Sequence, residues 1–214
     1  MSLTINVWSK VAVAVQTLLG AAKTITAISK ASPAVVTATH DYIVGDVVLL
    51  KVTGMRQLDY AVKRVSAVST TVSFTLEGTD STLFDTFVSG TAEKITFGAS
   101  AATFQDISAS GGEAAPIAIS LIHDDQDFEI PGNRSPINFT FGSLWDVADP
   151  ALVALAAFDS AKSIACVSFT FATGAKIFFA AYPSASLAPT GSAGQPVTTP
   201  VTLRLRGRLT PYAS

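Results

Sequence analysis

Short runs of strand-forming residues recur along nearly the whole sequence, and glycine and proline separate one run from the next. In one such run Val72, Phe74 and Leu76 alternate with small hydroxyl residues, as they do in a strand with one buried face. Valine, threonine and phenylalanine are abundant in these runs and favour extended structure. This punctuation restricts the chain to a mainly β fold.

The same pattern predicts where the strands lie. We expect strands at 34–39, 47–52, 63–69, 71–77, 92–97, 117–122, 137–141, 164–173, 175–184 and 199–210. The run 11–22 is ambiguous, because its valines alternate as in a strand whereas its second half could form a helix. We favour a strand for this run.

One segment has the signature of a helix. Asp149 can accept hydrogen bonds from the first turn, and Pro150 fits the first helical position. Leu152, Leu155 and Ala156 then share one helical face. We therefore expect a single amphipathic helix that closes one side of a β-sandwich.

The surface is unusually poor in charge, since only 14% of the 214 residues are charged and 49% are hydrophobic. Soluble domains have roughly 25% charged residues, so a membrane or partner subunits should cover much of this surface. The most apolar run, 11–22, is too short for a spanning helix, which needs about 20 residues. We therefore expect partner subunits and no membrane insertion. The net charge of −2 provides no general attraction to nucleic acid.

Three segments are expected to be loops. The stretch 108–113 is small and polar, which indicates a flexible loop. The stretch 124–129 is acidic, and 189–196 is a turn-rich connector.

No motif in the sequence indicates catalysis. The chain has no Gly-x-Ser-x-Gly elbow, no Walker A motif, no HExxH and no paired CxxC. Cys166, the one cysteine, lies in an apolar run and is expected to be a buried small hydrophobe. His40 and Asp46 flank turn signals, so we expect both to be architectural. The prediction is a protein with no catalytic residue and no cofactor.

Five acidic residues lie in a central segment that contains no lysine or arginine. They are Glu113, Asp124, Asp125, Asp127 and Glu129, and no lysine or arginine lies between positions 113 and 129. Clustered carboxylates beside His123 could bind a hard cation, but the spacing is not that of an EF-hand. We expect no metal here, and instead a solvated loop or a negative surface.

The last predicted strand carries the opposite charge. Arg204, Arg206 and Arg208 alternate with leucines, so they should lie on one face. This strip could be a solvated strand face, an inter-subunit contact or a phosphate-binding strip. An inter-subunit role suits arginine, whose planar fork pairs with carboxylates. The strip lacks the interleaved aromatic residues that single-strand binders use.

A family resemblance begins in the block 45–98. Its pattern consists of Gly45, Asp46, Val48, Gly54, Met55, Leu58, Phe74, Leu76, Gly78 and Asp80. With the segments 7–40, 122–132, 144–155 and 198–212, the chain resembles tail tube proteins of long, non-contractile-tailed bacteriophages over nearly its whole length. Asp59-Tyr60 stands where related units often have Asn-Gly, so this turn is expected to differ.

The resemblance implies a tail-tube-type β-sandwich or barrel with one flanking helix, whose copies assemble into a ring-shaped β-barrel. It implies one domain over 1–214, with 40–94 as a candidate β-rich inserted unit. Six copies would form a ring, and stacked rings would form the tube that conducts viral DNA. The implied partners are further copies, a tape measure protein, a tail terminator, and baseplate or distal tail proteins. The implied locations are the virion tail and, during assembly, the host cytoplasm.

DNA must slide through such a tube without sticking, so a neutral or negative lumen is expected. We therefore expect Trp8, Arg204, Arg206 and Arg208 at contacts between subunits. The acids at 113–129 are expected in the lumen or between stacked rings.

Two alternatives remain open from the sequence. A surface β-sandwich that recognises carbohydrate would need exposed aromatic faces, and Trp8 and Trp145 are the only tryptophans. An enzyme would need an acid–base constellation, for which no residue pair stands out.

Overall fold

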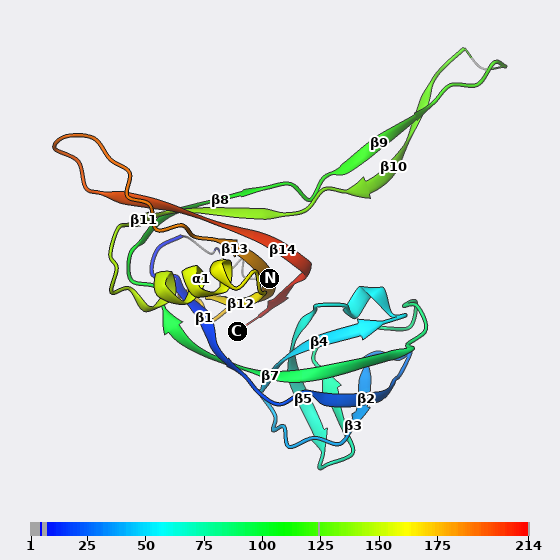
Figure 1. Cartoon of the computed structure of the whole chain (residues 1–214). Coiled ribbons are helices and arrows are strands. Elements are labelled where there is room, and N and C mark those ends of the chain that lie inside the picture. Colours follow the sequence, from blue (N-terminus) through cyan, green and yellow to red (C-terminus); the bar gives the residue numbers. More distant parts are fainter. Residues whose placement is uncertain (1–4, 6–7, 124, 214) are drawn as a thin grey trace.

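The computed structural model describes residues 5, 8–123 and 125–213. Within these residues the chain forms two lobes and a long projection (Figure 1). The strands are β1 Ala12–Leu19, β2 Lys23–Ile28, β3 Val35–Ala38, β4 Val47–Thr53, β5 Val62–Ser69, β6 Ser73–Leu76, β7 Ser89–Ser100, β8 Phe104–Ser110, β9 Ala114–Ile119, β10 Phe128–Arg134, β11 Asn138–Leu144, β12 Ala165–Thr170, β13 Lys176–Ser184 and β14 Thr198–Tyr212. The described part also contains the helix α1 Pro150–Ser160 and a 3-10 turn, η1 Arg56–Leu58.

The first lobe is a closed barrel. Its described strands follow the order β2-β3-β6-β5-β4-β7, and β2 pairs back onto β7. Val36, Leu50 and Phe74 are buried in its core. Closure pairs the edges of these strands, which removes the exposed edges that would otherwise promote aggregation.

His40 and Asp46 make structural contacts in this lobe. His40 is buried, its ring stacks on Tyr42 with 5.1 Å between centroids, and its Nδ1 accepts a hydrogen bond from the Tyr42 N–H at 3.1 Å. Asp46 accepts a hydrogen bond from the Ile43 N–H at 3.0 Å and pairs with Lys94 at 2.7 Å. These contacts of Asp46 are those of a turn residue, because the Asp46 N–H also donates to the Ile43 carbonyl oxygen at 3.1 Å.

The second lobe is an open sheet. Its described strands run β7-β1-β12-β13-β14-β11-β8, and neighbours are antiparallel. The helix α1 covers one face and contacts β1 and β13. Leu152 and Leu155 of the helix are buried against a core that includes Phe141, Phe169 and Leu203. Because side chains alternate along a strand, the residues between these core positions face away from α1.

A third core joins the two lobes. Leu49 and Ile95 of the barrel pack with Phe178 and Tyr212 of the sheet. The Arg64 N–H donates to the Tyr212 hydroxyl at 2.8 Å, and the Arg64 guanidinium lies 4.7 Å from the centre of the Tyr212 ring. The lobes therefore share buried surface as well as the strand β7.

Asp149 caps α1, as the sequence predicts. Its Oδ1 accepts hydrogen bonds from the N–H groups of Ala151 at 2.9 Å and Leu152 at 3.1 Å. Its Oδ2 accepts from the Ala102 N–H and the Thr103 hydroxyl, both at 2.9 Å. Burial alone would raise the pKa of Asp149, but these hydrogen bonds outweigh it and hold the pKa below its ordinary value.

The mainly β fold with a flanking helix is confirmed in the described residues. The favoured strand at 11–22 is also confirmed, as β1. No helix in residues 5, 8–123 and 125–213 is long and apolar enough to cross a membrane.

Several strand predictions were wrong. The structure adds β2, β8 and β10, which the pattern did not predict. The loop expected at 108–113 is wrong where β8 runs to Ser110, and the loop expected at 124–129 is wrong where β10 begins at Phe128. β9 begins and ends three residues before the strand predicted at 117–122. β8 and β10 expose most of their side chains, so they lack the alternation that marks a half-buried strand.

Candidate assembly interface

A two-stranded arm, formed by β9, β10 and the described residues between them, projects from the sheet lobe (Figure 1). Among the described residues its strands pair only with each other. The arm follows β8 and leads back into β11, so it continues the β8–β11 hairpin outward. The described side chains of both arm strands are exposed or half-buried. The arm therefore reaches away from the body with both faces open.

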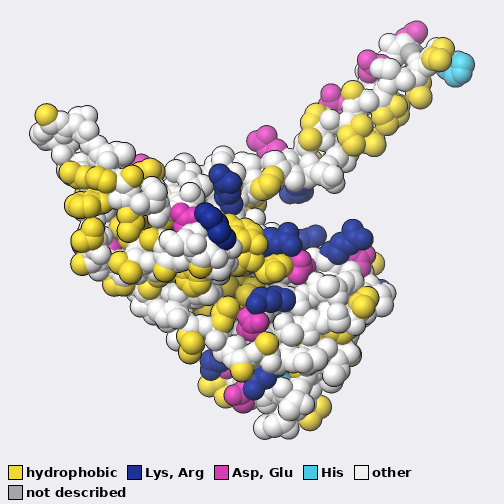
Figure 2. Space-filling view, viewed as in Figure 1, with side chains coloured by type: hydrophobic (Ala, Val, Ile, Leu, Met, Phe, Trp, Pro, Cys, Tyr) yellow, Lys and Arg dark blue, Asp and Glu magenta, His cyan; other side chains and the backbone are white. Residues whose placement is uncertain are grey.

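One face of the arm is apolar. The cross-strand pairs Ile117–Ile130 and Ile119–Phe128 lie directly opposite each other in register, and such pairs share a face. Ile117, Phe128 and Ile130 expose 51%, 45% and 43% of their surfaces. Figure 2 shows hydrophobic side chains gathered along the arm. An isolated two-stranded hairpin is marginally stable in water, so the arm needs packing beyond what the described residues supply.

The far end of the arm is acidic. Asp125, Asp127 and Glu129 are exposed and form no ion pair within the described residues; together they are termed the acidic tip. Asp124 lies outside the described residues. Glu113 directly precedes β9 at the base of the arm, so the structure separates it from the acidic tip.

The direction of the arm is set at Gly111 and Gly112. Gly111 has a φ of +85°, and a Cβ there would lie 2.0 Å from the Pro136 carbonyl oxygen. The Gly112 N–H donates to the Ser135 carbonyl oxygen at 3.1 Å. The two strands of the hairpin therefore approach each other at a point that only glycine permits.

A groove of about 660 Å³ lies beside the base of the arm. Its charged lining consists of Arg134, Arg206 and Arg208, and Ile137 and Leu205 are among its apolar residues; it is termed the arginine groove. Arg134 ends β10, whereas Arg206 and Arg208 belong to β14. In Figure 2 Lys and Arg side chains gather on the body beneath the arm.

The three groove arginines differ in their partners. Arg206 pairs with Asp59 at 3.4 Å, and its guanidinium lies 4.7 Å from the centre of the Tyr60 ring. Arg134 and Arg208 have no ion-pair partner in the described part of the chain. Two positive charges of the groove are therefore uncompensated by described residues.

The groove is fixed against the barrel. A Cβ at Gly207 would lie 2.6 Å from the Tyr60 carbonyl oxygen, so β14 touches the barrel backbone there. Tyr60 itself has a φ of 53°, which places this non-glycine residue in the left-handed region. Burial lowers the pKa of Lys63, and the charge of Arg208 lowers it further. The positive charges of Lys63 and Arg208 therefore repel each other at this side of the groove.

The face of the sheet turned away from α1 packs against the barrel at Phe178 and Ala180 and is polar beyond that contact. Register aligns Ser184, Thr202, Thr140 and Ser108 across β13, β14, β11 and β8. The next row consists of Tyr182, Arg204, Asn138 and Ser110. These two rows are termed the hydroxyl face. Arg204 is exposed on it, at the end from which the arm departs, and is its one ionisable group apart from the tyrosine.

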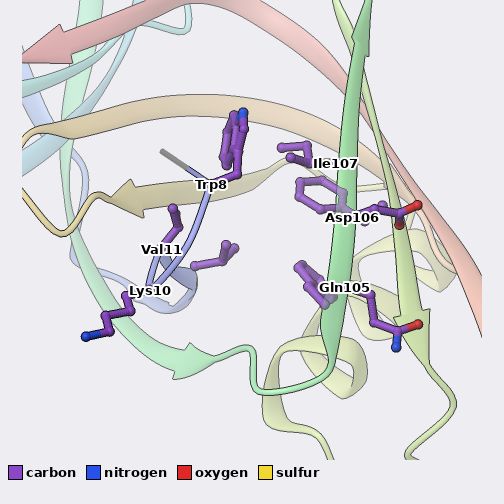
Figure 3. A pocket seen from close by; sticks show the side chains of 9 residues that line it. Trp8, Lys10, Val11, Gln105, Asp106 and Ile107 are labelled. Atoms are coloured by element: carbon purple, nitrogen blue, oxygen red, sulfur yellow. The ribbon is translucent and has the colours of Figure 1, made fainter. Parts of the chain in front are cut away.

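Trp8 lies at a separate, mainly apolar cavity (Figure 3). Trp8 is 59% exposed, and its ring centre lies 6.2 Å from that of Phe169 and 5.3 Å from that of Phe171. The cavity has a volume of about 400 Å³, and β8 residues such as Phe104 and Ile107 form its opposite wall. Among the described strands β8 is the last of the open sheet, so this cavity lies beside a free strand edge.

The structure brings together some of the predicted residues. Arg206 and Arg208 share one groove, whereas Arg204 lies on the hydroxyl face and Trp8 lies at another cavity. Arg134 was missed, because a single arginine at the end of an exposed strand gives no periodic signal. The apolar residues of the arm were missed for the same reason as β10. The sequence offered a possible cation site at 123–127. The described residues contain no group of three or more His, Cys, Asp or Glu side chains that could hold a metal ion. Asp124 lies outside the described residues.

Comparison with known families gives an independent line of evidence. The family described as "Phage tail tube protein, TTP" matches residues 53–214. No curated protein matches the chain. The matched segment contains the arm, the arginine groove, the hydroxyl face and the barrel strands β5, β6 and β7, whereas Trp8 and the strands β1, β2 and β3 precede it. Because the match spans more than half of the sequence and agrees with the mainly β fold, the chain belongs to the phage tail tube protein family.

Proposed function

We propose that six copies of this chain form a ring, and that stacked rings form a tube through which viral DNA passes into the host. Membership of the family makes the chain a structural protein of the virion tail; the family is not a class of enzymes. It also supports this role over carbohydrate recognition. The ring number, the conduction of DNA and assembly in the host cytoplasm are part of the proposal. So is contact with a tape measure protein, a tail terminator and a baseplate or distal tail protein.

The observation that carries the proposal is the open edge of β8. Within the described residues the sheet ends at β8, and an unpaired edge is a template for pairing with another chain. The cavity at Trp8 lies beside this edge and offers apolar surface to the same neighbour. We propose that a second copy covers the edge and Trp8 within the ring. The whole chain, including the barrel and residues 40–94, acts as one unit in this assembly.

The hydroxyl face is the proposed lining of the channel. Its serine, threonine and asparagine side chains are neutral, and the alignment of its rows covers four strands. A neutral polar surface would hydrate the DNA without a row of cations to hold its phosphates. Arg204 stands at the border of this face, where it can still contact a neighbouring subunit.

The first experiment is negative-stain electron microscopy of the purified protein, with light scattering on the same sample. Rings or hollow tubes with a central channel are expected. A particle that stays near 22.2 kDa when concentrated, or when seeded with preformed tails, would refute the proposed assembly.

A cysteine at Thr140 tests the channel lining. In assembled tubes of Thr140→Cys, a small maleimide should react by diffusing along the channel, whereas a maleimide carried on a globular protein should not. Cys166 does not interfere, because it is buried and burial raises the pKa of its thiol to about 12. Val153→Cys, on the exposed side of α1, is the matched variant and should react with both reagents. Reaction of Thr140→Cys with the protein-sized reagent would place the hydroxyl face outside the tube.

A further inference from the structure

The described residues of the folded chain leave the apolar face of the arm partly uncovered. Ile117, Phe128 and Ile130 remain about half exposed in the folded chain, and the arm strands have no substantial contact with other described elements. A second surface must cover this face if the arm is to be well ordered. In a protein of a family that assembles tubes, another copy of the same chain is the nearest candidate.

The arm is built to pack by its side chains rather than by adding a strand. Pro116 and Pro131 lie opposite each other in the two arm strands. Proline has no N–H to donate to a neighbouring strand, and it is a device that protects strand edges. The neighbouring surface should therefore lie against the arm's faces and tip.

Charge indicates which surface receives the tip. The acidic tip presents Asp125, Asp127 and Glu129 without an ion-pair partner in the described residues, and the arginine groove presents Arg134 and Arg208 in the same condition. Arginine and carboxylate form the strongest charge-assisted hydrogen bonds. The acidic tip lies at the far end of the arm and the arginine groove lies beside its base. The two surfaces are complementary in charge.

The two surfaces of one chain are too far apart to meet. The arm extends from Gly112 to beyond Ile119 before it turns, so at about 3.3 Å per residue its tip lies roughly 35 Å from the groove at its base. A second copy displaced by about one arm length would bring its groove to this tip. Such a contact joins unlike surfaces, so it repeats from copy to copy without closing on itself.

We propose that the acidic tip of each copy docks into the arginine groove of a copy in the next ring, with the apolar face of the arm packed along that neighbour. Arg134 and Arg208 bind the carboxylates, and Arg206, held by Asp59 and Tyr60, forms the fixed wall of the groove. This inference rests on the proposed function, since it assigns the contact that stacks the rings.

Charge reversal tests the pairing. The tip variant carries Asp125→Lys, Asp127→Lys and Glu129→Lys, and the groove variant carries Arg134→Glu and Arg208→Glu. Each variant alone should need at least roughly tenfold more protein to form tubes, because attraction between tip and groove becomes repulsion. A chain that carries all five substitutions should assemble at close to the wild-type concentration, since every reversed tip then meets a reversed groove. Sedimentation and electron microscopy measure both quantities.

The outcomes separate this inference from the proposed function. Lys30→Glu, at an exposed position on the barrel, is the control for a changed net charge and should assemble as wild type. If the tip and groove variants each form wild-type tubes, the docking inference is wrong and the proposed function stands. If each fails and the chain with all five substitutions also fails, the pairing is again wrong. If the wild-type protein forms no tube even on preformed tails, the proposed function itself fails.

Cross-linking gives a second measurement that does not depend on tube yield. A chain with both Asp127→Cys and Arg208→Cys, treated with a short bifunctional maleimide, should give a ladder of covalent multimers. A chain with Asp127→Cys and Lys30→Cys should not. A ladder from the second chain and none from the first would overturn the proposed contact.

Discussion

Replacing Asp149 by alanine should lower the free energy of unfolding by about 3 kcal/mol, because one substitution removes a helix cap and two further hydrogen bonds. The carboxylate accepts from two N–H groups of α1 and also from Ala102 and Thr103, which precede β8. Asp149 is buried, so alanine would remove this acceptor from the three N–H groups, whereas the Thr103 hydroxyl would keep Ser143 as a partner at 2.8 Å. For a chain of this size the melting temperature should fall by roughly 10 °C.

A nearby acid supplies the control for this prediction. Asp146 is exposed and accepts one hydrogen bond from the Ala148 N–H at 2.9 Å. Asp146→Ala should therefore change stability by less than about 1 kcal/mol. Equal losses for Asp146→Ala and Asp149→Ala in urea unfolding would contradict the special role of the buried cap.

The same carboxylate predicts a pH dependence. In the folded chain the pKa of Asp149 lies below its ordinary value of 3.8. A depressed pKa stabilises the fold above that ordinary value, and this stabilisation is lost as the pH falls through the folded-state pKa. The stability difference between wild type and Asp149→Ala should hence be constant near neutral pH and decrease below about pH 4. A difference that grew on acidification would refute this assignment.

Replacing Gly111 by valine should abolish tube formation while the body of the protein keeps most of its stability. The new side chain would collide with the Pro136 carbonyl oxygen, which a Cβ would approach to 2.0 Å. Relief of this collision must re-aim the arm. A rotation of about 20° at the base would move a tip roughly 35 Å away by roughly 12 Å, which is too far for any specific contact at the tip.

Gly194→Val is the matched control for this effect. Gly194 has a φ of +79°, and a Cβ there meets nothing within 4 Å. This variant therefore pays the cost of a left-handed valine without a collision at the arm. Thermal unfolding and electron microscopy should show similar melting temperatures for the two variants but tubes only for Gly194→Val. Tubes of normal yield from Gly111→Val would show that the direction of the arm does not matter.

The sequence predicted those parts of the fold whose signals are local or periodic. Asp149 and Pro150 mark the start of α1, and the long strand β14 was predicted because leucines alternate along it. The arm was only half predicted, since β10 has no buried face and so no alternation. Its existence depends on pairing with β9 and on Gly111, neither of which a periodic pattern reveals.

The arginine strip shows how tertiary structure divides a local pattern. Alternation predicted one row of three arginines. In the structure the pairing of β14 with β13 shifts register between Arg206 and Thr210, and the strand passes close to the barrel at Gly207. Arg206 consequently binds Asp59, which is distant in sequence, and Arg208 is left in the groove. The role of all three residues, and of Trp8, between subunits stays a prediction.

The strand β7 has a mechanical consequence for a tail built from this protein. A single continuous strand belongs to both the barrel and the open sheet, and a shared core joins the same two lobes. Bending a subunit between its lobes would have to break backbone pairing and expose buried side chains, so each subunit should be stiff. The arm has no such bracing, since it departs from the body through two glycines. A tail that flexes under load would hence concentrate its elastic deformation in the arms, and stretch or shear there before any subunit changes shape.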